Sequence, residues 1–155
     1  MPKITPFLWF DKEAGEAATF YTSVFKDSKI KRSTTLPNTP SGTVEIVSVK
    51  LLNQEFTLMS AGPLFKFNEA VSFVVHCDNQ EEIDYYWGKL SADPKAEQCG
   101  WLKDKYGLSW QIVPTVLPKM LQDQDPRKVA RVTEAFLQMK KFDIKTIERA
   151  YAGSK

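Results

Sequence analysis

Four polar residues on two short apolar segments are the best candidates for chemistry in this chain. The segment AVSFVVHCD (70–78) contains Ser72 and His76, and the segment after the turn Asp104–Gly107 contains Ser109 and Gln111. Both segments have the composition of β-strands, and alternate residues of a strand share a face. Hydroxyl, imidazole and amide groups on one face can hydrogen-bond a small polar molecule.

His76 is the only histidine of the chain, and imidazole groups titrate near neutral pH, so it is the candidate acid–base group. The alternative is a structural histidine that is hydrogen-bonded near the end of its strand. Gln111 has two interpretations as well, an amide that orients a ligand or an interior amide satisfied by its neighbours. A hairpin that turns at Asp104–Gly107 places Gly100 opposite Gln111, which would leave space beside the amide.

The remaining reactive or aromatic side chains favour structural interpretations. Cys77 and Cys99 show no CxxC spacing, and nothing near Cys99 in the sequence would activate its thiol. We therefore expect Cys99 to be a small buried residue and Cys77 to face a helix. The four tryptophans, Trp101 among them, are interpreted as core or dimer-interface residues.

Composition excludes several classes of partner. The chain has 155 residues, 43% of them hydrophobic and 26% charged, with a net charge of +2, as expected for one globular domain or two small fused halves. The basic residues are spread along the chain, and the short run Lys29–Arg32 is interpreted as a solvated strand edge, so no nucleic-acid or anionic-membrane partner is expected. No segment has the pattern of a membrane span or a signal peptide, and we expect a cytoplasmic protein with free thiols.

The order of predicted elements repeats along the chain. A strand over 4–10 precedes a helix in EAGEAATFYTSVF, with Asp11 as its expected cap, and three strands follow at 29–36, 43–52 and 54–60. A second strand, helix and hairpin then follow from residue 70, and Phe20-Tyr21 recurs as Tyr85-Tyr86. This recurrence predicts a β-α-β-β unit, with or without a further strand, that occurs twice. Asp125 and Asp143 are expected to cap two C-terminal helices.

Three segments resemble a known family: ITPFLWFDKEAGEAATFYTSVF, VSFVVHCDNQEEIDYYW and CGWLKDKYGLSWQIVP. The chain resembles the 3-demethylubiquinone-9 3-methyltransferase or PhnB-like family, within the glyoxalase/bleomycin-resistance/dioxygenase (vicinal oxygen chelate) superfamily, from about residue 3 to about residue 150. The resemblance implies an α+β fold of two βαβββ modules, at 3–62 and 70–114, that form an incomplete barrel around a cavity. A helical extension at 115–155 completes a single domain, and such proteins are commonly homodimers.

The resemblance also locates the positions that hold a divalent metal in metal-using members. These positions fall on Ile4, Ser72 and Gln111, and the matching strand of the first module offers only Leu58, Met59 or Ser60. None of them is a carboxylate or an imidazole, so no metal is expected. The seven glycines form no GxGxxG-like loop, so no S-adenosylmethionine site or other cofactor is expected.

The sequence therefore predicts an apolar cavity that contains a few polar groups. Its walls are Leu8, Phe10 and Val74, and its polar points are Ser72, His76, Ser109 and Gln111. The predicted function is a metal-independent small-molecule binder that acts as a homodimer. The alternative is an enzyme acting on a small aromatic or carbonyl compound, with His76 as its acid–base group.

Overall fold

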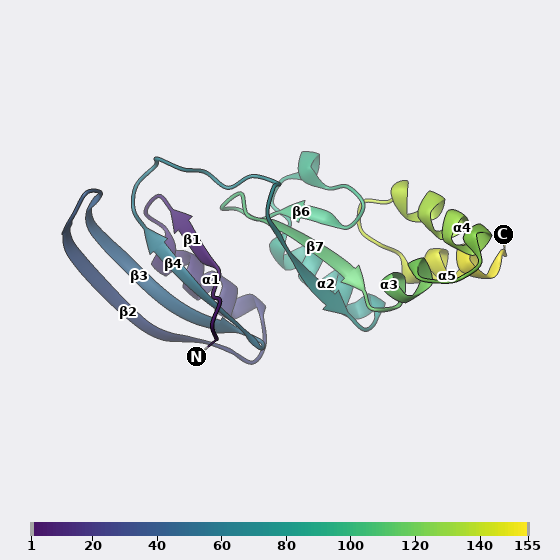
Figure 1. Cartoon of the computed structure of the whole chain (residues 1–155), viewed down its shortest axis with the longest axis horizontal. Helices are drawn as coiled ribbons and strands as arrows, with labels where there is room; N and C mark the ends of the chain where they lie inside the picture. Colours follow the sequence, from purple (N-terminus) through teal and green to yellow (C-terminus); the bar gives the residue numbers. More distant parts are fainter. Residues whose placement is uncertain (1, 155) are drawn as a thin grey trace. The chain divides into compact units, whose positions relative to one another are not determined.

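The computed structural model describes residues 2–154, and the chain divides into two compact units between Phe67 and Asn68. Each unit packs helices against a β-sheet, and a mixed α+β fold with C-terminal helices results (Figure 1). Among the described residues, no helix is both long and apolar enough to cross a membrane.

The first unit contains a four-stranded sheet covered by one helix. Its elements are β1 (Phe7–Phe10), α1 (Ala14–Val24), β2 (Ser28–Thr39), β3 (Gly42–Leu51) and β4 (Gln54–Ser60). The strand order is β1-β4-β3-β2, with β1 parallel to β4 and the other pairs antiparallel. These strands confirm the prediction from the sequence, and β2 is left as an edge of the sheet.

The start of α1 is held by the sheet and not by the predicted cap. The N-cap residue is Glu13, whose side chain makes no capping hydrogen bond. The backbone N–H groups of Ala14 and Gly15, which have no partner within the helix, donate to Ser60 Oγ (2.9 Å) and Glu45 Oε1 (3.1 Å). The prediction of Asp11 as cap is therefore wrong, because groups remote in sequence satisfy these donors.

The second unit has a three-stranded sheet. Its elements are β5 (Ser72–Cys77), α2 (Gln80–Leu90), the short 3-10 helix η1 (Pro94–Ala96), β6 (Trp101–Lys103) and β7 (Ser109–Pro114), in the strand order β5-β7-β6. This unit has one strand fewer than the predicted βαβββ module, and neither sheet of the protein closes on itself. The side of α2 that carries Ile83, Tyr86 and Leu90 is buried.

Three helices end the chain: α3 (Val116–Leu121), α4 (Pro126–Leu137) and α5 (Ile144–Ala152). The predicted caps of the last two are confirmed, because Asp125 accepts from Arg127 N–H and Asp143 accepts from Thr146 N–H. The segment between α4 and α5 is attached to the residues just before β6. The N–H group of Cys99 donates to the carbonyl of Met139 and that of Gly100 to the carbonyl of Lys140, both at 2.8 Å. The helical extension is thus part of the second unit.

Candidate functional site

The predicted polar residues lie together on one face of the second sheet. In the parallel pair β5–β7, Ser72 is aligned with Ser109, Val74 with Gln111 and His76 with Val113. On the other side of β7, Lys103 is aligned with Ser109 and Trp101 with Gln111. Most of the intervening residues are buried, Val75 and Ile112 among them. We call the face of β5, β7 and β6 that carries Ser72, Val74, His76, Ser109, Gln111, Trp101 and Lys103 the polar face.

Gln111 and Ser72 are in direct contact on this face. Gln111 Nε2 donates a hydrogen bond to Ser72 Oγ at a distance of 2.9 Å, and this bond fixes the orientation of the amide. The amide carbonyl oxygen then remains available as an acceptor, and the Ser72 hydroxyl keeps its proton to donate. Two groups that the sequence placed on one face thus form one small hydrogen-bonding unit.

Ser109 is the most unusual residue of the polar face. Its side chain is only 1% exposed, and its Oγ is the one buried side-chain oxygen or nitrogen, among residues 2–154, that has no hydrogen-bond partner. A buried hydroxyl without a partner costs about 1–3 kcal/mol. Such a group in a native structure calls for a specific explanation, and it is a candidate contact for a small polar molecule.

A pocket of about 430 Å³ adjoins Ser109. Its walls come from β6, β7 and the segment before β6, and apolar atoms predominate on its surface. The residues that line it are Glu69, Ala96, Gln98, Cys99, Trp101, Leu102, Lys103 and Ser109. The volume is within the range of small-molecule sites.

The turn between β6 and β7 determines where Ser109 lies. Asp104 Oδ1 accepts hydrogen bonds from the N–H groups of Tyr106 (2.9 Å) and Leu108 (3.1 Å), and Asp104 Oδ2 accepts from the indole of Trp110 (2.9 Å). Gly107 has φ of 84°, a backbone conformation that favours glycine in such a turn. The turn therefore holds Trp110 toward the helix side and Ser109 on the opposite face.

A charged pair borders the pocket. Lys103 Nζ forms an ion pair with Glu69, and this contact holds the pKa of the Glu69 carboxyl below its ordinary value. Both residues line the pocket, so their charges offset each other there. The pocket thus has little net charge to attract a strongly ionic ligand.

His76 lies at the far end of the polar face and is exposed. It is four residues from Ser72 along β5, a separation of roughly 13 Å at the usual rise of a strand. Its ring makes no hydrogen bond to any residue in the described part of the chain. The structure therefore gives the imidazole no hydrogen-bond partner that would orient it. Val74, two residues earlier on the same face, is 42% exposed.

Leu8 and Phe10 lie elsewhere than the sequence analysis expected. They are 8% and 2% exposed, and they belong to the buried core of the first unit. Phe10 is aligned with Ser60, whose side chain contacts the start of α1, so both lie on the helix-covered side of the sheet. We therefore leave these two residues out of the site.

The hairpin register differs by one residue from the prediction. Trp101, and not Gly100, is aligned with Gln111, while the carbonyl of Gly100 accepts from Ile112 N–H. A Cβ atom on Gly100 would lie 2.5 Å from the ring of Phe142, so this ring occupies the space that Gly100 leaves. Cys99 is half-buried and lines the pocket, whereas we expected it to be buried.

The residues that the family resemblance predicts at metal-ligand positions do not have the chemistry of a metal site. Ser72 and Gln111 are hydrogen-bonded to each other, and Ile4 is an exposed hydrocarbon side chain. Within residues 2–154, no three His, Cys, Asp or Glu side chains gather as a metal would require. A neutral hydroxyl and amide are weak donors to divalent ions, so no chemical step is assigned to a metal here.

Ser109 is the one pocket residue that was predicted from the sequence as a site residue, and Lys103, Trp101 and Glu69 are among those that were missed. Lys103 and Trp101 reach the polar face through the alternation of β6, and a strand of only three residues gives little signal in the sequence. Trp101 was also interpreted as a core or interface residue. Glu69 precedes β5 in an irregular segment, and no sequence pattern connects it to Lys103.

The strand order of each sheet and the helix that packs on it are those of a vicinal oxygen chelate fold, and solved structures match this fold. One is a point mutant of the fosfomycin resistance protein FosX from Listeria monocytogenes, complexed with Mn(II) and 1S,2S-dihydroxypropylphosphonic acid. Its TM-score is 0.57 and its sequence identity is 13%, over 79% of this chain and 100% of that chain. FosX from Mesorhizobium loti has a TM-score of 0.55 and 12% identity over the same shares. At these identities the likeness concerns the fold alone.

Residues 2–113 match the model of the 3-demethylubiquinone-9 3-methyltransferase family, and the chain belongs to this family. The chain is also similar to a putative 3-demethylubiquinone-9 3-methyltransferase, PhnB protein, from Bacillus cereus. That structure has a TM-score of 0.61 and 33% identity, over 74% of this chain and 100% of that chain. No curated protein matches the chain.

Proposed function

We propose that the second unit binds a small organic molecule on its polar face, without a metal. The observation that carries this proposal is Ser109, a buried hydroxyl that lacks a hydrogen-bond partner and borders a pocket of about 430 Å³. A ligand oxygen or nitrogen in that pocket would satisfy the hydroxyl and remove its desolvation cost.

The lining favours a ligand with an apolar body and one or two polar groups. Trp101, Leu102 and Ala96 supply the apolar contacts, and the indole offers a surface for a planar ring. Ser109 can donate to or accept from a carbonyl or hydroxyl group of the ligand. Because Lys103 is paired with Glu69, an uncharged carbonyl or aromatic compound suits the pocket best.

Binding without a metal is supported by the contact between Gln111 and Ser72. In a chelating site, those positions would present free donor atoms to the ion. Here the amide N–H is already directed at the hydroxyl, which leaves one acceptor and one donor facing the sheet surface. These groups recognise a ligand by hydrogen bonds and not by coordination.

Titration of ¹⁵N-labelled protein with small aromatic carbonyl and phenolic compounds, acetophenone and phenol among them, tests this proposal by NMR. We expect saturable shifts of the amide signals of Trp101, Lys103 and Ser109. Ser109→Ala should abolish them, and Ser154→Ala, at an exposed position beyond α5, should not. Ser109→Ala should leave the ligand-free protein equally stable or up to about 1 kcal/mol more stable, because it removes an unpaired hydroxyl. Shifts that persist in Ser109→Ala would contradict the proposal.

We also propose that the protein acts as a homodimer in the cytoplasm. Large apolar side chains are exposed in both units, including Phe7 (56%), Val71 (62%) and Leu137 (48%), and a second copy would cover part of this surface. Both cysteines are free thiols, which a reducing compartment preserves.

A further inference from the structure

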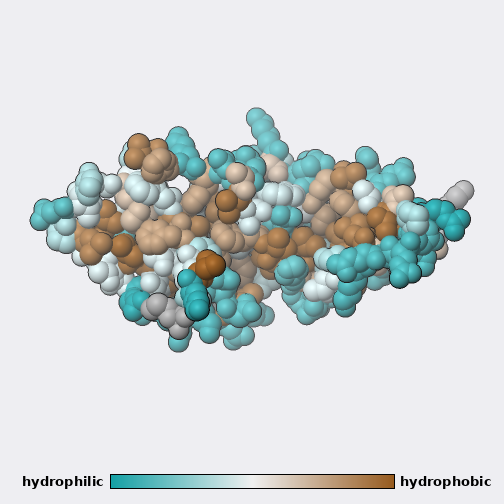
Figure 2. All heavy atoms as spheres, viewed as in Figure 1, coloured by the Kyte–Doolittle hydropathy of each residue, from teal (hydrophilic) through white to brown (hydrophobic). Residues whose placement is uncertain are grey.

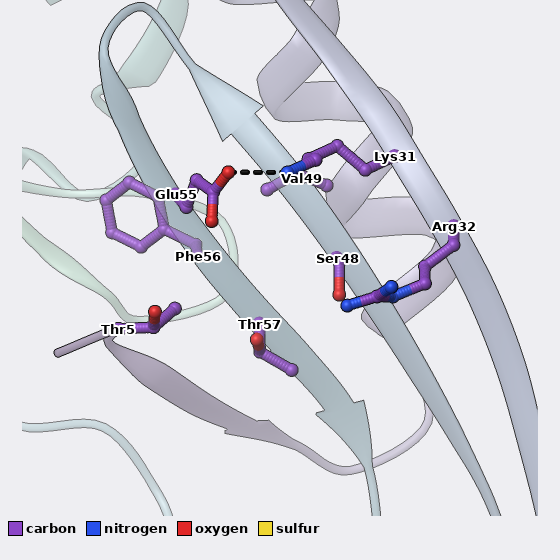
Figure 3. Close-up of a pocket in the computed structure, with 8 residues that line it drawn as sticks. All are labelled: Thr5, Lys31, Arg32, Ser48, Val49, Glu55, Phe56 and Thr57. Atoms are coloured by element: carbon purple, nitrogen blue, oxygen red, sulfur yellow. Dashed lines mark hydrogen bonds and ion pairs between the residues drawn. The ribbon is translucent and has the colours of Figure 1, made fainter. Parts of the chain in front are cut away.

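A second pocket lies on the first unit and has a different chemical character. It occupies the face of the four-stranded sheet opposite α1 and has a volume of about 350 Å³ (Figure 3). Three of its polar residues come from neighbouring strands, Arg32 from β2, Ser48 from β3 and Thr57 from β4, and Thr5, Lys31 and Glu55 line it as well. Arg32, Ser48 and Thr57 are aligned with one another across the sheet. Neighbouring strands lie about 4.8 Å apart, so the side chains form one closely spaced row.

An irregularity in β2 brings two consecutive basic residues to this pocket. Ile30 is aligned with Val49 and Arg32 with Ser48, so Lys31 is an extra residue in the pairing of the two strands. Such a bulge interrupts the alternation of faces that would otherwise separate neighbouring side chains. Lys31 and Arg32 therefore both line the pocket, and the basic run noted in the sequence is more than a solvated strand edge.

The charges of the pocket are not balanced. Lys31 Nζ lies 2.5 Å from Glu55 Oε1, and this contact lowers the pKa of the Glu55 carboxyl, which therefore stays ionised at neutral pH. Arg32 makes no hydrogen bond or ion pair with any residue in the range 2–154, and the hydroxyls of Ser48 and Thr57 also lack hydrogen-bond partners there. After Lys31 and Glu55 neutralise each other, the Arg32 charge remains.

We propose that Arg32, Ser48 and Thr57 form a binding site for a tetrahedral oxyanion, such as the phosphate group of a small monoester. The guanidinium can donate two parallel hydrogen bonds to two oxygens of the anion, and each hydroxyl can donate one more. Figure 3 shows the guanidinium extending from β2 over the sheet toward Ser48. Donors on three strands match the three or more oxygens of a phosphate better than the two of a carboxylate. The pocket also has room for the organic part of a monoester.

Isothermal titration calorimetry of the full chain at constant ionic strength tests the site, with inorganic phosphate, glycerol 3-phosphate and acetate as probes. We expect saturable binding of one phosphate or phosphate ester per chain and much weaker binding of acetate. Tighter binding of glycerol 3-phosphate than of phosphate would identify a monoester as the ligand class, and equal binding would identify the free anion. Binding of acetate as tight as that of phosphate would overturn the proposal.

Two variants separate a built site from general electrostatic attraction. Arg32→Gln should weaken phosphate binding at least about tenfold, because it removes a charged pair of donors. Arg127→Gln removes the same charge from a residue with an 86% exposed side chain in α4, and it should leave binding unchanged. Ser48→Ala combined with Thr57→Val retains every charge and should still weaken binding several-fold. Equal losses in the Arg32 and Arg127 variants, or no loss in the hydroxyl variant, would contradict the assignment.

Discussion

At the scale of single residues, the account depends on groups whose hydrogen bonding is incomplete. Ser109 is buried without a partner, and Gln111 directs its amide at Ser72 and leaves its carbonyl oxygen available. The alternation of strands places Ser109 and Gln111 on one face of β7, and the register of β5 with β7 places Ser72 on the same face. That Ser109 has no partner was not predictable, since hydrogen bonding depends on residues distant in sequence.

The two cysteines are expected to differ in reactivity. Cys77 is fully buried, and this burial raises the pKa of its thiol to about 12, whereas Cys99 is half-buried beside the pocket. A thiol-specific reagent at pH 8 should therefore modify Cys99 in the folded protein and Cys77 only after unfolding. Mass spectrometry of the labelled peptides checks this, with Cys99→Ala as the control that should show no labelling. Rapid labelling of Cys77 in the native protein would contradict the burial.

The same pKa has a consequence for stability at high pH. An unfolded thiol releases its proton near its ordinary pKa of 9.0, while the folded protein retains the Cys77 proton up to about 12. The unfolded state then binds fewer protons, so the free energy of unfolding should fall as pH rises through this interval. Urea titrations between pH 8 and pH 11 should show a smaller decline for Cys77→Ala than for the natural chain.

At the scale of elements, the sequence predicted the helices and strands whose position depends on local periodicity. It did not predict the features that depend on tertiary contacts. The strands of both units and the caps of α4 and α5 were predicted, because alternation and capping are local properties. The cap of α1 was wrong because Ser60 and Glu45 reach its first turn from the sheet. Helix α3 was not predicted because it is only six residues long and contains Pro118. The proline lies in the first turn, where a backbone N–H would have no partner within the helix.

Glycine substitutions test the attachment of the C-terminal segment to the hairpin. Gly100 has φ of 84°, and a Cβ there would meet the Phe142 ring at 2.5 Å, so Gly100→Ala should reduce the free energy of unfolding by about 2–4 kcal/mol. Gly88 lies on the exposed side of α2 with no atom within 4 Å of a Cβ, so Gly88→Ala should raise it by about 0.5–1 kcal/mol. Chemical denaturation measures both, and a neutral Gly100→Ala would show that the hairpin and Phe142 are not in contact in solution.

At the scale of the whole molecule, the recurrence of a strand, a helix and a hairpin in the sequence correctly predicted two related units. The strand and hairpin expected from residue 70 account for the three strands of the second sheet, whereas the βαβββ module implied by the family resemblance has a fourth strand that this sheet lacks. The internal repeat and the family resemblance both predicted a vicinal oxygen chelate fold, and this prediction is confirmed.

Self-association is the prediction that belongs to this scale. Figure 2 shows apolar atoms at the surface among the hydrophilic ones, and several large apolar side chains are more than half exposed, including Ile4 (85%) and Leu64 (72%). A monomer rarely leaves so much apolar surface in contact with water. Sedimentation velocity at micromolar concentration should show a dimer, and a single monomeric species would contradict the proposal of a homodimer.

Native mass spectrometry of the protein purified from its own host tests the central claim most directly, because it reports a bound organic molecule and a bound metal ion in one spectrum. We predict a mass increase from one small organic molecule per chain and no divalent metal ion, with the organic molecule absent from Ser109→Ala. One divalent metal ion per chain, lost in Gln111→Ala, would contradict the account, because it would show that Ser72 and Gln111 belong to a chelating site after all.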